Sequence, residues 1–235
     1  QSKDATLLLG VHTEKVFTRE NEARINLSDG QKIYARLVIA ADGRSSYVRQ
    51  NAGVSVATKR FGQKALAFAV THPVPHENVS TEIHRRGGPF TLVPLPDHEC
   101  SPSSAVVWME TSDKVALLME MDTDSFETEM SARSCSILGP LKLATARTVW
   151  PIISQIAGRL SAQRIAIIAE AAHAIPPIGA QGLNMSLEDI KTLLELATKS
   201  DDIGSKSVLD AYHKARINDV RVRVGGISLL NQTSI

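Results

Sequence analysis

One stretch of this chain joins a bare, glycine-bearing loop to the start of a helix, where an electron-rich ligand could bind. Residues 165–169 are apolar and mostly β-branched, which is typical of a short buried strand. Pro176 and Pro177 exclude a helix in the following segment, and Gly179 and Gly182 let the backbone turn sharply or approach a ligand. The unpaired N–H groups and the positive dipole end of the next helix favour an anionic or electron-rich group.

The helix after this loop is predicted to be amphipathic. Its apolar residues recur at steps of four and three, so we expect them to form one buried stripe. These residues are Leu183, Leu187, Ile190, Leu194 and Ala197. An ordinary strand–loop–helix connection without a ligand could show the same two glycines, so this geometry alone assigns no function.

A second candidate segment follows an earlier apolar run. Residues 37–41 are continuously apolar, as a central parallel strand should be, and the sequence DGRSS at 42–46 ends that run. Ser45 or Ser46 could cap a short helix that extends to Asn51. Taken alone, this is a common strand–turn–helix corner.

Together the two segments resemble the flavin signatures of the FAD-dependent aromatic hydroxylases, the para-hydroxybenzoate hydroxylase family. The sequence EAAH at 170–173, the two prolines and QGLN at 181–184 have the offsets of one signature, and ADGRSS at 41–46 matches the other. In that family an acidic residue bonds the ribitol of FAD and the Gly-Leu-Asn backbone lies against the flavin ring. The resemblance implies the following cofactor-binding residues: Asp42, Gly43, Arg44, Glu170, Pro177, Gly179, Gln181, Gly182, Leu183 and Asn184.

Three positions depart from the family pattern. Ala169 and Ala180 stand where glycine is usual, and Glu170 replaces an aspartate. The longer Glu170 side chain needs a different rotamer or a small backbone shift to reach the ribitol. Ala180 fits the loop only if its φ angle is negative.

The predicted fold class is α/β (α+β). The resemblance implies an incomplete FAD/NAD(P)-binding Rossmann-like domain with an inserted, mostly antiparallel substrate-domain sheet. We place residues 1–58 in the FAD-binding domain, 59–150 in the substrate domain, and 151–235 in the returning FAD-binding domain with its C-terminal helix. The chain begins with Gln1 and has no G-x-G-x-x-G motif, so we expect an N-terminally truncated fragment that holds FAD weakly or not at all.

Individual elements can also be predicted along the chain. Residues 5–11 are expected to be strand-like, and strands are expected at 66–70, 79–84, 90–95, 106–109 and 115–119. Residues 126–138 are predicted to be helical, with Gly139 and Pro140 ending the helix. Phe90 and Trp108 are expected in the core rather than against a lipid.

Residues 87–96 together with Val107 and Trp108 resemble the ubiquinone-biosynthesis branch of the family. The implied function is an FAD-dependent monooxygenase that hydroxylates the aromatic ring of a polyprenylated phenol, with NAD(P)H as co-substrate and O₂. No catalytic residue can be assigned from the sequence. Two alternatives stay open: a related flavin reductase acting on isoprenoid double bonds, and a non-catalytic lipid-binding member of a biosynthetic complex.

Composition narrows the expected partners. The net charge of +1 argues against nucleic acid, and the two cysteines, Cys100 and Cys135, suit a reducing compartment. The histidines between 72 and 98 lack metal-ligand spacing, so no metal is expected, and His173 is expected to hold its loop by hydrogen bonds. The predicted localisation is cytoplasmic, and the sequence leaves open a peripheral contact with the inner membrane, a ubiquinone-biosynthesis complex and a homo-oligomer.

Overall fold

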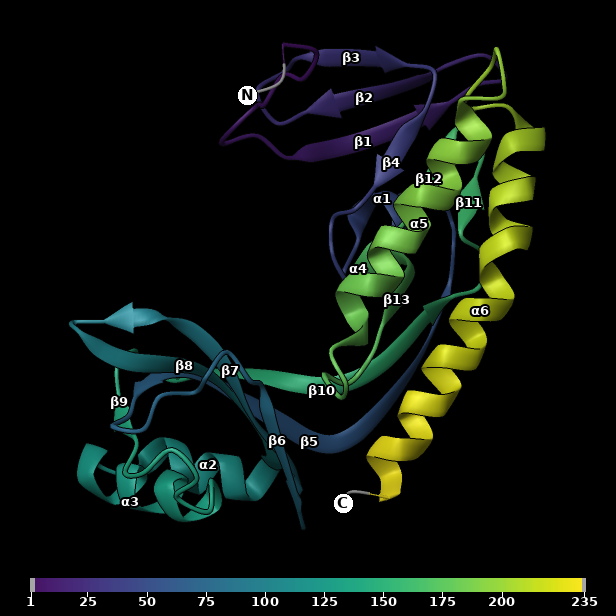
Figure 1. Ribbon diagram of the computed structural model, residues 1–235. Coiled ribbons are helices and arrows are strands. Elements are labelled where there is room, and N and C mark those ends of the chain that lie inside the picture. Colours follow the sequence, from purple (N-terminus) through teal and green to yellow (C-terminus); the bar gives the residue numbers. More distant parts are fainter. Residues whose placement is uncertain (1–2, 234–235) are drawn as a thin grey trace. The chain divides into compact units, whose positions relative to one another are not determined.

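The computed structural model describes residues 3–233, coloured along the sequence in Figure 1. Its Cα atoms group into two compact units, each of which is described by itself. The first unit holds the chain up to Lys59 and returns with Ser154–Gly226. The second unit holds Arg60–Ile153 and the segment from Ile227 onward.

A small parallel sheet lies at the centre of the first unit. Strand β4 (Val38–Ala40) pairs in parallel with β12 (Ile165–Ile167), which also pairs antiparallel with β11 (Ser161–Ala162). The three residues of β12 are all buried in the core of this unit. Both segments were predicted to be strands from their continuous apolar sequence. The expectation that residues 37–41 form a central strand is wrong, because β4 lies at an edge of this sheet in the described chain and Ile39 is 51% exposed.

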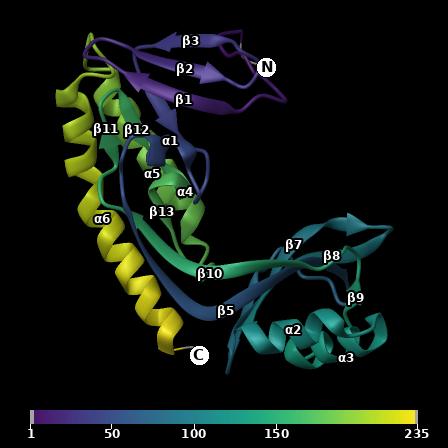
Figure 2. The ribbon, with the colours of Figure 1, turned by 180° about the vertical axis from the view of Figure 1, so that it is seen from behind.

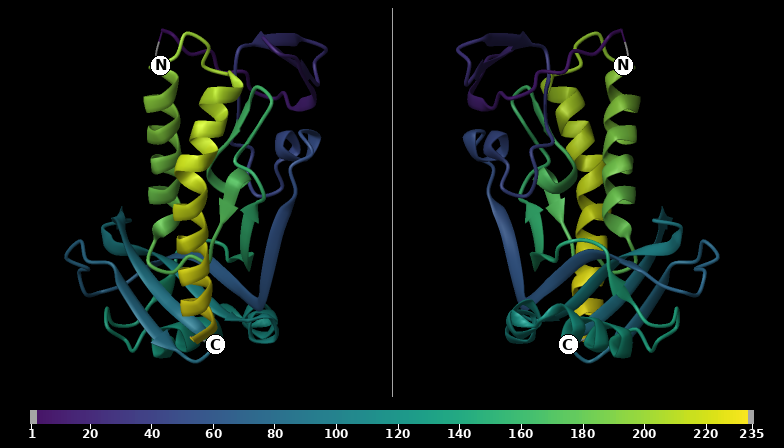
Figure 3. Two further views of the ribbon diagram at one scale, coloured as in Figure 1. Left: turned by 90° about the vertical axis from the view of Figure 1, so that its right-hand side faces the viewer. Right: turned by 90° about the vertical axis from the view of Figure 1, so that its left-hand side faces the viewer.

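Two long helices flank this sheet in the first unit. Helices α5 (Gln181–Ala197) and α6 (Lys206–Thr233) lie side by side in both views of Figure 3. Tyr212 of α6 is fully buried, and its hydroxyl donates to the carbonyl oxygen of Ile167 at 3.0 Å. The short helix α4 (Ala169–Ala172) and strand β13 (His173–Ala174) join β12 to the loop before α5.

The predicted buried stripe of α5 is wrong. Helix α5 buries the opposite face through Met185, Asp189 and Leu193. The stripe residues stay exposed, with Leu183 at 69%, Leu187 at 53%, Ile190 at 48% and Leu194 at 61%, while Ala197 is half-buried. The periodicity correctly predicted a helix, but it cannot tell which of two apolar faces the rest of the described chain covers.

A second, three-stranded sheet belongs to the same unit. Its order is β1 (Thr13–Thr18), β2 (Ala23–Leu27) and β3 (Lys32–Ala35), all antiparallel. Val16, Ala23 and Leu27 are buried on one of its faces. The strand expected at residues 5–11 is wrong, because these residues have no regular structure and Leu7 and Leu9 are exposed. Without a partner strand in the described chain, this apolar run has no ladder to join.

The second unit is built on an antiparallel sheet. Strands β5 (Val56–Thr71), β8 (Ser101–Thr111), β7 (Gly88–His98) and β6 (Thr81–Arg85) are neighbours in that order, and β9 (Lys142–Leu143) pairs with β5. Strand β10 (Thr148–Ala157) lies beside β5 and leads back into the first unit, where it pairs with β13. The inserted antiparallel sheet predicted from the sequence is present.

Helices α2 (Ser112–Glu120) and α3 (Thr123–Arg133) lie beside this sheet in Figure 2. Phe90, Trp108 and Phe126 meet there in edge-on and tilted ring contacts within a buried cluster. Phe90 and Trp108 are fully buried, so the prediction that they are core residues is confirmed. At the far end of the chain, Asn231 donates to Gln63 at 2.7 Å, which explains why the end of α6 groups with this unit.

Two element predictions in this unit need correction. Residues 115–119 form part of helix α2 rather than a strand, because Thr111 caps the amide of Lys114 and Val115 and Leu118 face the core three residues apart. Helix α3 ends at Arg133 instead of Leu138, since the backbone turns at Cys135 and Ser136, whose φ angles are positive. No helix among the described residues is long and apolar enough to span a bilayer.

Candidate functional site

The two candidate segments meet because their strands are parallel neighbours. Ala40 at the end of β4 is in register with Ile167 at the end of β12, and the Ile168 amide donates to the Ala40 carbonyl at 3.0 Å. The carboxyl ends of parallel strands lie at one edge of a sheet, where open α/β folds bind ligands. The segments that follow the two strands, 41–46 and 169–173, are therefore brought together although more than a hundred residues separate them.

Arg49 holds these two segments to each other. Its guanidinium donates from Nη1 to the carbonyls of Arg44 at 3.1 Å and Ala171 at 2.8 Å, and from Nη2 to Arg44 again at 3.1 Å. Arg49 is buried, and this burial lowers the pKa of its side chain, which the nearby charge of Asp42 opposes. The side chain is thus used within the protein.

Asp42 organises the first segment. One carboxylate oxygen accepts from the Ser46 hydroxyl, and the other accepts from the Val48 amide at 3.0 Å. The Ser46 hydroxyl in turn accepts from the Arg49 amide at 3.0 Å, so the start of α1 (Tyr47–Asn51) is capped twice. Gly43 has a φ of +80° and faces open space, so the turn stays accessible. Asp42 is exposed, but both of its oxygens are already engaged locally.

Glu170, the acidic residue of the second segment, differs from Asp42 because its carboxylate is not engaged by neighbouring groups. Glu170 is exposed in the first turn of α4 and makes no hydrogen bond or ion pair within the described chain. Ala169 before it has a φ of +52°, the left-handed conformation that explains why glycine is usual there. The Ala169 amide donates to Asp189 Oδ2 at 3.0 Å, which holds this conformation in place.

The loop and the first turn of α5 form an open surface. Pro177, Gly179 and Gly182 are exposed, and a Cβ atom added at either glycine would meet nothing within 4 Å. Ala180 precedes the helix with no side-chain cap, which leaves the first N–H groups of α5 without a side-chain acceptor. Leu183 and Asn184 are exposed on the first turn.

The expectation that Ala180 has a negative φ is wrong. Its φ is +49°, so an alanine occupies the left-handed conformation at the N-cap. The loop must reverse direction within one residue to enter the helix, and this geometry prevails over the preference of alanine. Gln181 helps to hold the turn, because its side-chain amide donates to the Gly179 carbonyl at 3.1 Å.

A buried charge cluster around Asp189 holds the segment 169–173 against helices α5 and α6. Asp189 is fully buried and accepts from the Ala169 amide, from His173 Nε2 at 2.7 Å and from Arg216 Nε at 2.9 Å. Burial opposes the charge on Arg216, but its hydrogen bonds to Asp189 and Asp219 outweigh burial and raise the pKa of Arg216. His173 therefore positions the loop, as expected. The contact between Arg216 and Asp189, which are 27 residues apart, could not be read from the sequence.

These residues fit the pyrimidine edge and ribitol of FAD. The uncapped start of α5 presents free N–H groups toward an open surface, and the bare Gly182 leaves room for a flat ring. Glu170 has an unengaged carboxylate for a ribitol hydroxyl. Asp42 differs, because its oxygens already bond Ser46 and Val48, which suits the ordering of a loop better than direct contact with the cofactor.

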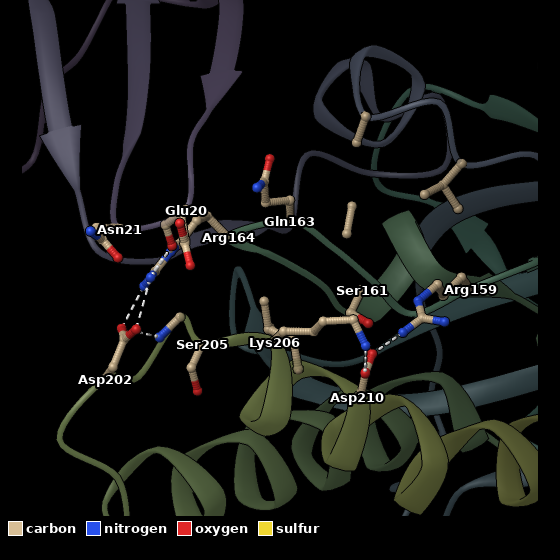
Figure 4. A pocket seen from close by; sticks show the side chains of 15 residues that line it. Glu20, Asn21, Arg159, Ser161, Gln163, Arg164, Asp202, Ser205, Lys206 and Asp210 are labelled. Atoms are coloured by element: carbon tan, nitrogen blue, oxygen red, sulfur yellow. Dashed lines mark hydrogen bonds and ion pairs between the residues drawn. The ribbon is translucent and has the colours of Figure 1, made fainter.

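The first unit also has a cavity of about 790 Å³, shown in Figure 4. It is lined by residues around the start of α6, among them Arg159, Arg164, Asp202 and Asp210, and by none of the predicted site residues. Arg164 binds both carboxylate oxygens of Asp202, and Asp210 pairs with Arg159 and Lys206. This charge arrangement is internally satisfied, and we assign no ligand to the cavity.

Residues 11–223 match the family model described as an FAD binding domain. The chain therefore belongs to the FAD-binding domain family of the flavin-dependent monooxygenases. Among its relatives, it is similar to the ubiquinone hydroxylase UbiL of Rhodospirillum rubrum, with 34% identity over 197 residues that cover 82% of this chain and 45% of that protein. It is also similar to the 3-demethoxyubiquinol 3-hydroxylase of Escherichia coli, with 27% identity over 87% of this chain and 52% of that protein.

Solved structures share the fold. PqsL of Pseudomonas aeruginosa in complex with 2-aminobenzoylacetate matches with a TM-score of 0.77 and 21% identity over 95% of this chain and 63% of that one. Klebsiella pneumoniae HpxO complexed with FAD and uric acid matches with a TM-score of 0.71 and 18% identity, covering 93% of this chain and 56% of that one. The chain spans about half the length of the curated relatives it matches.

Proposed function

We propose that this chain is the flavin-facing part of an FAD-dependent monooxygenase that hydroxylates the aromatic ring of a polyprenylated phenol in ubiquinone biosynthesis. The observation that carries the proposal is the open, uncapped start of α5 beside an exposed Glu170. Similarity to two ubiquinone-pathway hydroxylases supports the substrate class. NAD(P)H and O₂ are the proposed co-substrates.

Each part of the site would have a separate task. The Gly182–Asn184 backbone and the positive end of α5 would hold the electron-rich edge of the flavin and stabilise negative charge on its reduced form. Glu170 would orient the ribitol, while Arg49 and Asp189 keep the two loops in register beneath it. When bound, FAD supplies the redox chemistry that takes hydride from the nicotinamide and activates oxygen.

The proposal is tested on the protein expressed from its complete gene. The purified protein is expected to show a flavin absorbance spectrum, and to consume NAD(P)H and O₂ when a short-chain polyprenyl phenol is added. Mass spectrometry of the product is expected to show one added oxygen atom. A protein that takes up no flavin under any condition would refute the proposal.

Product analysis also separates the two alternatives. A related flavin reductase acting on isoprenoid double bonds would add two hydrogen atoms and no oxygen to the lipid. A non-catalytic lipid-binding member of a biosynthetic complex would bind the phenol without consuming NAD(P)H.

A further inference from the structure

One face of the small β1–β2–β3 sheet carries cations and aromatic rings in two cross-strand rows. In one row, Arg24 of β2 is in register with both Phe17 of β1 and Tyr34 of β3. In the next row, Asn26 is in register with both Lys15 and Lys32. Residues directly opposite in paired strands, and residues two apart in one strand, point to the same face. We call these six residues the basic–aromatic face.

The opposite face of this sheet packs against the core of the first unit. Val16, Ala23 and Leu27 alternate with the residues of the basic–aromatic face and are buried. By contrast, Lys15, Lys32 and Tyr34 are exposed, with Tyr34 at 60%. A sheet face that exposes two aromatic rings among cations, when the opposite face already supplies the core, is available to bind a partner.

The charge on this face is not neutralised within the described chain. Lys15, Arg24 and Lys32 contribute three positive charges, and the structure shows no ion pair for any of them in residues 3–233. A partner with negative charge would complement this charge.

The aromatic rings hold the cations in place. The guanidinium of Arg24 lies 4.4 Å from the centre of the Phe17 ring, and the Lys15 ammonium lies 4.7 Å from it. Phe17, Arg24 and Tyr34 also line a hollow of about 270 Å³ with Thr18, Arg19 and Glu22. Arg24 Nε is buried and has no hydrogen-bond partner in the described chain.

We infer that the basic–aromatic face binds the surface of a membrane that contains anionic lipids. Lysine and arginine side chains are attracted to phosphate headgroups, and tyrosine and phenylalanine rings favour the interfacial layer. The face therefore combines both interactions on one rigid sheet. It would bring the first unit to the bilayer in which a polyprenylated substrate dissolves, but its binding requires neither flavin nor substrate.

Nucleic acid is the competing anionic partner, and the observations favour the membrane. The face has only three cations, in two cross-strand rows, whereas a nucleic-acid site neutralises a longer series of phosphates along the backbone.

Vesicle co-sedimentation of this chain tests the inference. We expect binding to vesicles of equal parts phosphatidylglycerol and phosphatidylcholine, little binding to phosphatidylcholine alone, and a marked loss of binding at high salt. Each surface cation strengthens such binding about fivefold, so the double variant Lys15→Glu, Lys32→Glu should bind at least about 30-fold more weakly. Tyr34→Ala should weaken binding in both salt conditions.

Matched controls keep the result interpretable. Lys199→Glu with Lys214→Glu reverses two exposed cations elsewhere in the first unit and should bind anionic vesicles within about twofold of the unchanged chain. Circular dichroism should show that all variants stay folded.

Three results would overturn the inference. The first is equal binding of the two double variants. The second is binding that is lost only when the exposed stripe of α5 is changed, as in Leu187→Gln with Leu194→Gln. The third is tight binding of a single-stranded oligonucleotide with no binding to vesicles. Variants that lose vesicle binding should still take up flavin. A negative vesicle result therefore contradicts only the membrane inference, whereas absence of flavin uptake contradicts the proposed oxygenase.

Discussion

Arg49 donates a hydrogen bond of 2.8 Å from Nη1 to the carbonyl oxygen of Ala171, 122 residues further along the chain. The same guanidinium binds the carbonyl of Arg44, so one side chain connects the two flavin signatures. The site is thus built from two loops whose relative position depends on a buried cation. This contact explains how a bare loop and an exposed turn can be held ready for a ligand.

Substituting Arg49 should separate the two loops. Arg49→Lys keeps the charge, but its single ammonium lacks the planar fork that reaches both carbonyls. The buried carbonyls would lose their donors, so we expect a loss of about 2 kcal/mol in the free energy of unfolding. Urea denaturation measures it. Arg221→Lys, at an exposed position of α6, should stay within about 0.5 kcal/mol of the unchanged chain, and equal losses in the two variants would contradict the account.

A second prediction concerns the contribution of buried Asp189 to stability. Asp189→Asn leaves the buried Arg216 guanidinium without this carboxylate and weakens the bond to the Ala169 amide. We expect a loss of about 3–5 kcal/mol in unfolding free energy. Hydrogen exchange should show faster opening at the Ala169 amide, whereas the exposed neighbour Glu188→Gln should change neither quantity. Unchanged protection of that amide would show that Asp189 does not hold the loop.

The positive φ angle of Ala169 leads to the prediction that glycine at this position stabilises the protein. Ala169 has a φ of +52°, a conformation that glycine adopts without the steric cost of a Cβ atom. Ala169→Gly should therefore raise the free energy of unfolding by about 1 kcal/mol. Ala215→Gly, in the middle of α6, should lower it by about 1 kcal/mol. Thermal unfolding of the two variants should shift in opposite directions; a fall in both would contradict the strain at Ala169.

His72 in the second unit predicts a pH dependence of stability. It is buried, with Nδ1 at 2.8 Å from the Val74 carbonyl and Nε2 at 2.9 Å from the Ser104 hydroxyl. Burial lowers the pKa of His72 below its ordinary 6.5. The unfolded chain therefore takes up the proton first as the pH falls, so the stability is complete above pH 6.5 and is lost as the pH falls toward the folded pKa.

The His72→Gln variant isolates that contribution. Its unfolding free energy should be lower than that of the unchanged chain near neutral pH, because one of two buried partners loses its bond. The difference between the two proteins should shrink as the pH falls below 6.5. Urea titrations across this range measure the difference, and a gap that stays constant or widens toward acid pH would be evidence against a neutral His72.

Much of the local structure could be predicted from the sequence, because it depends on near neighbours. The apolar runs of β4 and β12, the loop with Pro176 and Pro177, and the helix after it all follow from periodicity and backbone restrictions. A serine cap of α1 was also predicted, with Ser45 and Ser46 as the candidates, and the structure shows that Ser46 is the cap. The ten candidate site residues fall in two segments, Asp42–Arg44 and Glu170–Asn184, which follow the two parallel strands, although their contacts with a cofactor stay a prediction.

The remainder depends on contacts that sequence spacing does not encode. The exposed face of α5 was misassigned because Leu187 and Leu194 look the same whether a neighbour covers them or not. Residues 115–119 are as apolar as a strand, and only the cap at Thr111 marks them as helical. The links from Arg49 to Ala171 and from Arg216 to Asp189 join distant segments through polar atoms, which leave no periodic signal.

The central claim is that the flat ring of FAD rests against the start of α5 at Gly182. Gly182→Phe tests it directly, because a Cβ atom added at this exposed position meets nothing within 4 Å, so we expect the fold to stay intact. Gly225→Phe, at an equally open helical position in α6, is the matched control. In protein expressed from the complete gene, FAD fluorescence titration should show at least about a 100-fold loss of affinity in Gly182→Phe and no change in Gly225→Phe. Equal FAD affinity in all three proteins would contradict the account.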